Sequence, residues 1–100
     1  MDYFEMIEAL YYLQSINKLT TEQICLWYAL LYIDFSRAWE KCFVVNDLTL
    51  ESLTRLSRED ISKARSVLKQ KGYIDFVPCE HRFSYCINDI TVQLCKNLPF

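Results

Sequence analysis

The sequence predicts a mainly helical α+β fold, and the segment from Thr49 to Ile87 carries most of the evidence. A short apolar helix is followed by a tight turn and a longer basic helix, which Gly72 ends as a left-handed residue. Two runs of alternating apolar residues then predict a β-hairpin. A helix braced by a shorter one and followed by a hairpin is a winged helix-turn-helix. We therefore expect residues 1–100 to form one winged helix-turn-helix domain with an extra N-terminal helix and a C-terminal β-hairpin wing.

The composition is that of a small folded domain. The chain has 100 residues, of which 52% are hydrophobic and 15% aromatic, with one glycine and two prolines. So few flexible residues argue against disorder, and the apolar content indicates either a very aromatic core or apolar surface covered by another subunit. The longest uncharged apolar run, 24–33, is about half of the roughly 20 residues that a membrane-spanning helix needs. Because the acidic N-terminus lacks the basic region of a signal peptide, we expect a cytoplasmic protein.

The reactive side chains do not suggest an enzyme. The five cysteines are odd in number and irregularly spaced, so we expect reduced thiols and no disulfide framework. Cys79, His81 and Cys86 form a conceivable zinc set, but a fourth ligand and Cys-x-x-Cys spacing are missing, which favours incidental cysteines. The single histidine has no nucleophile motif beside it, and one glycine cannot make a phosphate loop. We expect no catalytic residue, cofactor or metal.

Charge is distributed unevenly along the chain. The formal net charge is −2, yet residues 55–71 hold six basic against two acidic side chains, a local +4. Residues 1–54 hold three basic against eight acidic side chains, and residues 72–100 hold two against three. An acidic body with one basic helix is polarised in a way that can orient it on a phosphate backbone.

Two helices and a strand are predicted before the basic segment. Apolar residues at mostly helical spacing predict the first helix over 2–16, and Thr20 with Gln23 forms a capping box for a second helix over 20–36. This second helix is apolar all round, so we expect it to be buried on all sides, either inside the domain or in a subunit interface. Residues 43–45 are aromatic and β-branched and predict a short strand.

The remaining elements follow from caps and periodicity. A helix over 49–55 is predicted with Thr49 as its cap and with Leu50 and Leu53 facing inward, and a helix over 58–71 with Ser57 as its cap. The wing is predicted over 73–87, its two strands separated by a turn at 78–82. The tail from Ile90 to Leu98 predicts a further short helix.

The helix over 58–71 is the candidate recognition helix. Ile61, Ala64 and Leu68 fall on one face, which leaves the basic side chains on the other. Its first turns are placed to reach base edges and its later residues to reach phosphates, while the tip of the wing can touch the backbone. The DNA-binding residues expected on this basis are Arg58, Ser62, Lys63, Arg65, Lys69 and, on the wing, Arg82. The alternative is an ordinary amphipathic helix whose charges are only solvated.

Two segments resemble a known family. One contains Leu26-Trp27-x-x-Leu30, and the other contains Ala64-Arg65-x-x-Leu68-x-x-x-Gly72-x-Ile74. Over roughly residues 19–87 the chain resembles the N-terminal winged-helix domain of phage replisome organisers and DnaD-type replication initiation proteins. The resemblance implies a domain that binds double-stranded origin DNA or self-associates, normally followed by a second domain that engages single-stranded DNA or helicase-loading partners. Much of the second motif is shared with other winged-helix regulators.

The surplus of aromatic residues near the N-terminus has two interpretations. These side chains are core residues or a homodimer interface, for which we single out Tyr3, Ile7, Tyr11 and Tyr12. The sequence therefore leaves three functions open: a replication initiation domain that binds DNA and forms a dimer or higher oligomer, a winged-helix transcriptional regulator, and a protein–protein interaction module without DNA binding.

Overall fold

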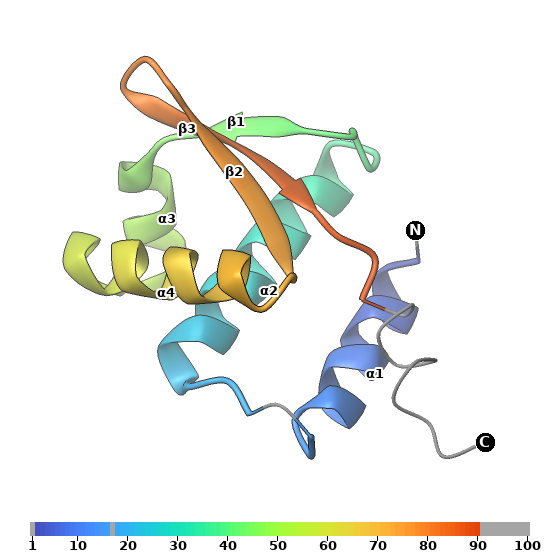
Figure 1. Ribbon diagram of the computed structural model, residues 1–100. Coiled ribbons are helices and arrows are strands. Elements are labelled where there is room, and N and C mark those ends of the chain that lie inside the picture. The colour runs from blue at the N-terminus through green and yellow to red at the C-terminus, as the bar shows by residue number, and fades with distance from the viewer. Residues whose placement is uncertain (1, 17, 91–100) are drawn as a thin grey trace. The chain divides into compact units, whose positions relative to one another are not determined.

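The computed structural model describes residues 2–16 and 18–90. In these residues it has four helices and a three-stranded antiparallel sheet, which confirms a mainly helical α+β fold (Figure 1). The chain divides into two units, one of residues 1–19 with 89–100 and one of residues 20–88. The predicted tail helix lies, apart from Ile90, outside the described residues.

The first unit contains helix α1 (Tyr3–Leu13). The helix begins after Asp2, whose carboxylate accepts hydrogen bonds from the backbone N–H groups of Phe4 and Glu5 at 2.8 and 3.3 Å. It ends at Leu13, earlier than predicted. The side chain of Gln14, the residue that follows, accepts a hydrogen bond from the backbone N–H of Leu19 at 2.8 Å, a contact that periodicity cannot reveal.

The second unit opens with helix α2 (Thr21–Ser36), and its predicted capping box is present at Thr20 and Gln23. Its inner side is buried, as at Trp27, but Tyr32 and Phe35 remain 55% and 51% exposed. Within one chain α2 is therefore not buried on all sides, and the burial of its exposed residues in a subunit interface stays a prediction. No helix among the described residues, α2 included, is long and apolar enough to cross a membrane.

Helix α3 (Asp47–Thr54) begins two residues earlier than predicted. Its cap is Asn46, whose side-chain oxygen accepts a hydrogen bond from the backbone N–H of Thr49 at 2.8 Å, so Thr49 itself lies inside the helix. Leu50 is buried as expected, whereas Leu53 is 49% exposed and does not face the core.

Helix α4 (Arg58–Gln70) matches its prediction closely. The Ser57 hydroxyl accepts a hydrogen bond from the backbone N–H of Asp60 at 3.1 Å, and the inward residues Ile61, Ala64 and Leu68 are buried. The chain leaves the helix through Gly72 at a φ of 83°, the left-handed value that favours glycine.

The sheet contains β1 (Phe43–Val45), β2 (Ile74–Cys79) and β3 (Arg82–Ile87) in the order β1-β3-β2. The β2–β3 hairpin has a tighter turn than predicted, because Cys79 pairs with Arg82 and leaves only two residues between the strands. One of them, Glu80, has a φ of 59°. Pro78 fits inside β2 because this strand is at an edge of the sheet, where a missing N–H donor is tolerated.

Candidate nucleic-acid interface

Three of the predicted DNA-binding residues lie on the exposed face of the first half of α4: Arg58, Ser62 and Lys63. The Arg58 guanidinium is 3.5 Å from the Glu51 carboxylate of α3, and the Lys63 ammonium is 3.2 Å from Glu59 one turn earlier. Ion pairs between such exposed groups contribute little free energy, about 0–1 kcal/mol. Both cations therefore remain available to a stronger anionic partner.

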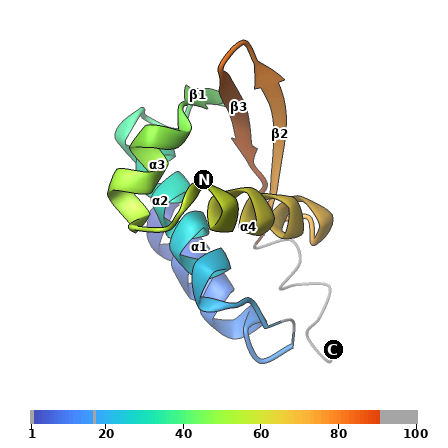
Figure 2. The same cartoon turned by 90° about the vertical axis from the view of Figure 1, so that its left-hand side faces the viewer.

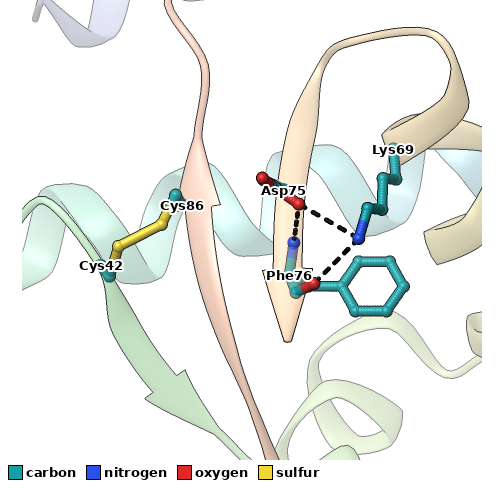
Figure 3. The surroundings of a disulfide bond; sticks show 5 residues. All are labelled: Cys42, Lys69, Asp75, Phe76 and Cys86. Atoms are coloured by element: carbon teal, nitrogen blue, oxygen red, sulfur yellow. Dashed lines mark hydrogen bonds and ion pairs between the residues drawn. A yellow bond between two sulfur atoms is a disulfide. The ribbon is translucent and has the colours of Figure 1, made fainter. Parts of the chain in front are cut away.

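Lys69 connects the end of α4 to strand β2 (Figure 3). Its ammonium donates to the backbone carbonyl of Phe76 at 3.1 Å, is 3.2 Å from the Asp75 carboxylate, and lies 4.7 Å from the centroid of the Phe76 ring. The hydrogen bond from Lys69, with that from the backbone of Phe76, lowers the pKa of Asp75. Lys69 is still 48% exposed, but its position is set by the hairpin.

Arg65 does not lie on the exposed face, and this corrects its predicted placement. It is only 4% exposed. Its guanidinium donates to the Asp47 carboxylate at 2.9 Å and to the Tyr85 hydroxyl at 2.6 Å, and it lies 3.9 Å from the centroid of the Phe83 ring. These partners come from α3 and β3, so Arg65 joins α4 to both. A helical wheel marks it as outward only because the covering strand comes from farther along the chain.

The electrostatics of this cluster follow from its burial. Desolvation by itself would lower the pKa of Arg65, but the hydrogen bonds to Asp47 and Tyr85 outweigh it and the pKa is raised. Burial raises the pKa of Tyr85, partly offset by the hydrogen bond from Arg65. Arg65 is thus charged, and its charge is matched by Asp47 inside the protein and does not contribute to a basic surface.

A cleft of about 480 Å³ separates the tip of the hairpin from the first residues of α3 and α4. Arg58 and Arg82 face it from opposite sides. The one carboxylate in its wall, Asp47, is paired with Arg65, so the cleft has an excess of positive charge. In Figure 1 the hairpin tip lies above α3, on the side where α4 begins. The full lining is Asn46, Asp47, Leu48, Arg58, His81 and Arg82.

The sequence indicated only part of this cleft. The sequence predicts Arg58 and Arg82 as binding residues but not residues 46–48, because it predicts that α3 begins at Thr49. The available signal was Asn46, since asparagine is among the residues most favoured at a helix N-cap.

Cys42 and Cys86 form a disulfide, which contradicts the expectation of reduced thiols (Figure 3). Their Cα atoms are 4.5 Å apart although 44 residues separate them in sequence. The pairing of β1 with β3 brings them together, and irregular cysteine spacing cannot reveal such a pairing. Cys25 and Cys79 are free thiols. Among the described residues, no three His, Cys, Asp or Glu side chains are grouped so as to hold a metal ion.

Of the four residues predicted to form a dimer interface, two are exposed and two are partly buried. On α1, Tyr11 and Tyr12 are 78% and 53% exposed, while Tyr3 and Ile7 are partly buried. Phe4, which is not among the predicted residues, is 79% exposed.

In the second unit an apolar groove of about 340 Å³ lies between α2 and α3, lined by Cys25, Tyr28, Ala29, Tyr32, Leu53 and Thr54.

Comparisons with protein families, with curated proteins and with solved structures find no match for the chain.

Proposed function

We propose that residues 20–88 form a winged helix-turn-helix that binds double-stranded DNA, and that the chain acts as the DNA-binding and oligomerisation domain of a bacterial, phage or mobile-element replication initiation protein. Helices α3 and α4 are the helix-turn-helix, α4 is the recognition helix, and the β2–β3 hairpin is the wing. The replication role rests on the family resemblance of the two sequence motifs.

The order of elements supports the winged-helix assignment. The second unit runs α2, β1, α3, α4, β2, β3, and β1 returns to pair with β3 at the edge away from β2. In this arrangement α4 packs against α2 and α3, and the hairpin rises from the end of α4 (Figure 2). A recognition helix needs such a brace because it must enter the major groove without losing its packing.

The observation that carries the proposal is the convergence of Arg58 and Arg82 on one basic cleft. Lys63 is exposed farther along α4 and is not part of the lining of this cleft. A helix and a hairpin that present cations on the same side can contact a groove and its flanking phosphates together. Arg65, in contrast, positions this surface from within and makes no direct contact in this proposal.

The proposal is tested with the variant Arg58→Glu, Lys63→Glu, measured by fluorescence anisotropy on duplex DNA at several salt concentrations. If both side chains contact phosphates, affinity at low salt falls at least tenfold, and the slope of log K against log salt becomes shallower by about 1.8. Substituting Arg65 is unsuitable here, because its loss would disturb the fold.

Lys41→Glu is the matched control, since Lys41 is exposed and precedes the end of β1 that lies away from the hairpin tip. Its affinity should stay within about twofold of the unaltered protein's, as expected for a charge more than a Debye length from the phosphates. Equal affinity of the double variant and the unaltered protein would count against the assignment of α4 as the recognition helix. Footprinting on an origin and on a promoter separates the replication role from the transcriptional alternative.

Self-association is the second candidate function, and the exposed aromatic residues of α1 favour it. Phe4 and Tyr11 are both more than three-quarters exposed, which is unusual for side chains that are enriched in subunit interfaces. We expect Tyr11→Ser, Tyr12→Ser to lower the sedimentation coefficient at high protein concentration, with Ser15→Ala, in the turn that follows α1, as the control. A protein that is monomeric before any substitution would eliminate this function.

A further inference from the structure

The Cys42–Cys86 disulfide links the two ends of the segment that contains the proposed helix-turn-helix. Cys42 directly precedes β1 and Cys86 lies near the end of β3, so the bond closes a loop that contains α3, α4 and β2. It continues the register in which Phe43 faces Tyr85 by one more pair. Its Cα separation of 4.5 Å is that of a non-hydrogen-bonded antiparallel pair, in which two side chains lie on the same face.

That face is the solvent side of the sheet. Phe43 and Tyr85 are buried on the inner face, and Cys42 and Cys86 alternate with them on the outer face. Cys42 is exposed and Cys86 is partly exposed. Cys42 is therefore the half of the disulfide that is more open to a reductant in solution.

Strand β1 is held in the sheet by fewer backbone pairings than β2. It has three residues, is an edge of the sheet, and pairs with β3 alone. The disulfide holds the end where Phe43 lies, while at the other end Val45 leads directly into Asn46, the cap of α3. Side-chain contacts hold β1 as well. The Arg37 guanidinium donates to the Val44 carbonyl at 3.0 Å and lies 5.9 Å from the centroid of the Phe43 ring, which stacks on Tyr85.

We propose that the Cys42–Cys86 disulfide is a redox-controlled cross-link between β1 and β3. It is formed in the oxidised protein and is reduced by a thiol reductant. A thiolate of the reductant attacks the Cys42 Sγ atom, the S–S bond breaks, and Cys86 leaves as a thiolate that takes a proton. A second thiolate of the reductant then attacks the mixed disulfide and releases Cys42. Two electrons pass to the protein, and the reductant ends as a disulfide.

Opening the bond loosens β1 and the link from the sheet to α3. Closing a loop of this length lowers the entropy of the unfolded chain, so we expect the unfolding equilibrium constant to rise by roughly a hundred- to a thousandfold on reduction. Locally, amide hydrogen exchange at Phe43–Val45 should become at least tenfold faster and should exceed the rate that global unfolding of the reduced protein allows, whereas exchange at the buried turns of α4 follows global unfolding.

The test compares the unaltered protein in oxidised and reduced glutathione buffers, with a Cys42–Cys86 cross-linked peptide detected by mass spectrometry in the first and not in the second. Urea unfolding and amide exchange are then measured on both samples. Cys42→Ser should match the reduced protein in both buffers. Cys79→Ser, which removes an exposed free thiol, is the control and should respond to reduction as the unaltered protein does.

Two results would overturn the proposal. One is the absence of the cross-linked peptide under oxidising conditions. The other is equal β1 exchange and equal urea midpoints in samples that differ in that peptide.

A further measurement rests on the proposed DNA binding and keeps the two proposals distinguishable. The oxidised protein should bind duplex DNA several-fold more tightly than the reduced one, because β3 carries Arg82 and α3 forms one wall of the cleft. If neither form binds DNA, the proposed function fails while the exchange data still decide the redox proposal. Binding that is identical in both forms, despite looser β1 exchange, would confine the effect of the bond to stability.

Discussion

Helices α2 and α4 each bury one charged side chain, and the surroundings of the two charges are opposite. Arg65 of α4 is 4% exposed and contacts a carboxylate, a hydroxyl and an aromatic face. Asp34 of α2 is 1% exposed, and its Oδ1 atom has no hydrogen-bond partner. A buried charge with partners joins the elements that supply them, whereas one without them opposes folding in its ionised form.

The two buried side chains also affect the pH dependence of stability differently. Burial, and after it the neighbouring charge of Glu40, raises the pKa of Asp34 above its ordinary value of 3.8. The ionised carboxylate is therefore disfavoured in the folded protein. The pKa of Arg65 is instead raised above its already high ordinary value, so this side chain keeps its charge in the folded protein.

The largest effect is expected from Arg65→Ala. It leaves Asp47 and the Tyr85 hydroxyl without their partner in a buried site, and removing one member of such a pair costs about 3–5 kcal/mol. Urea unfolding measures the loss. The double variant with Asp47→Ala should lose less than the sum of the two single variants, and strict additivity would show that the pair is not coupled.

Leu68→Ala is expected to have the next largest effect. Leu68 is fully buried on the inner face of α4, and truncating such a side chain costs about 2–5 kcal/mol through lost burial and the cavity that remains. The comparison residue is Leu53 of α3, which is half-exposed, so Leu53→Ala should cost less than about 1 kcal/mol. Similar losses at the two positions would contradict the inward and outward assignments.

Asp34→Asn should have a smaller effect of the opposite sign. Since the folded protein binds a proton at Asp34 more readily than the unfolded chain does, stability is lost as pH rises from 3.8 through the raised pKa. Asparagine stays neutral, so the variant should be more stable than the unaltered protein at pH 7 and equally stable near pH 3. Thermal unfolding across this range measures the difference, and a variant that is less stable at pH 7 would indicate that the carboxylate has a favourable partner.

The smallest effect on stability is expected from Tyr32→Ser, on the exposed side of α2 where Phe35 also lies. Tyr32 is 55% exposed, and substitutions at such positions change stability by about 0.5 kcal/mol or less. Equilibrium unfolding checks this at a protein concentration where the chain is monomeric. A concentration-dependent loss would instead indicate that this side of α2 is covered by another molecule.

The sequence by itself determined the features that depend on interactions between residues close together in the chain. Helix caps at Thr20 and Ser57, the apolar period of α4, the exit through Gly72 and the alternation of the hairpin all depend on residues within a few positions of one another. These interactions fix the elements and their order, and they placed Arg58 and Arg82 correctly on the surface.

What only the tertiary structure decided depends on residues far apart in the chain. Strand β3 covers Arg65 with Phe83 and Tyr85, and the β1–β3 pairing joins Cys42 to Cys86, so a predicted surface cation became a buried connection and two predicted thiols became a disulfide. Likewise, an apolar helix such as α2 carries no internal sign of which side its neighbours will leave exposed. Periodicity reports the faces of one element, and long-range packing decides which of those faces meets water.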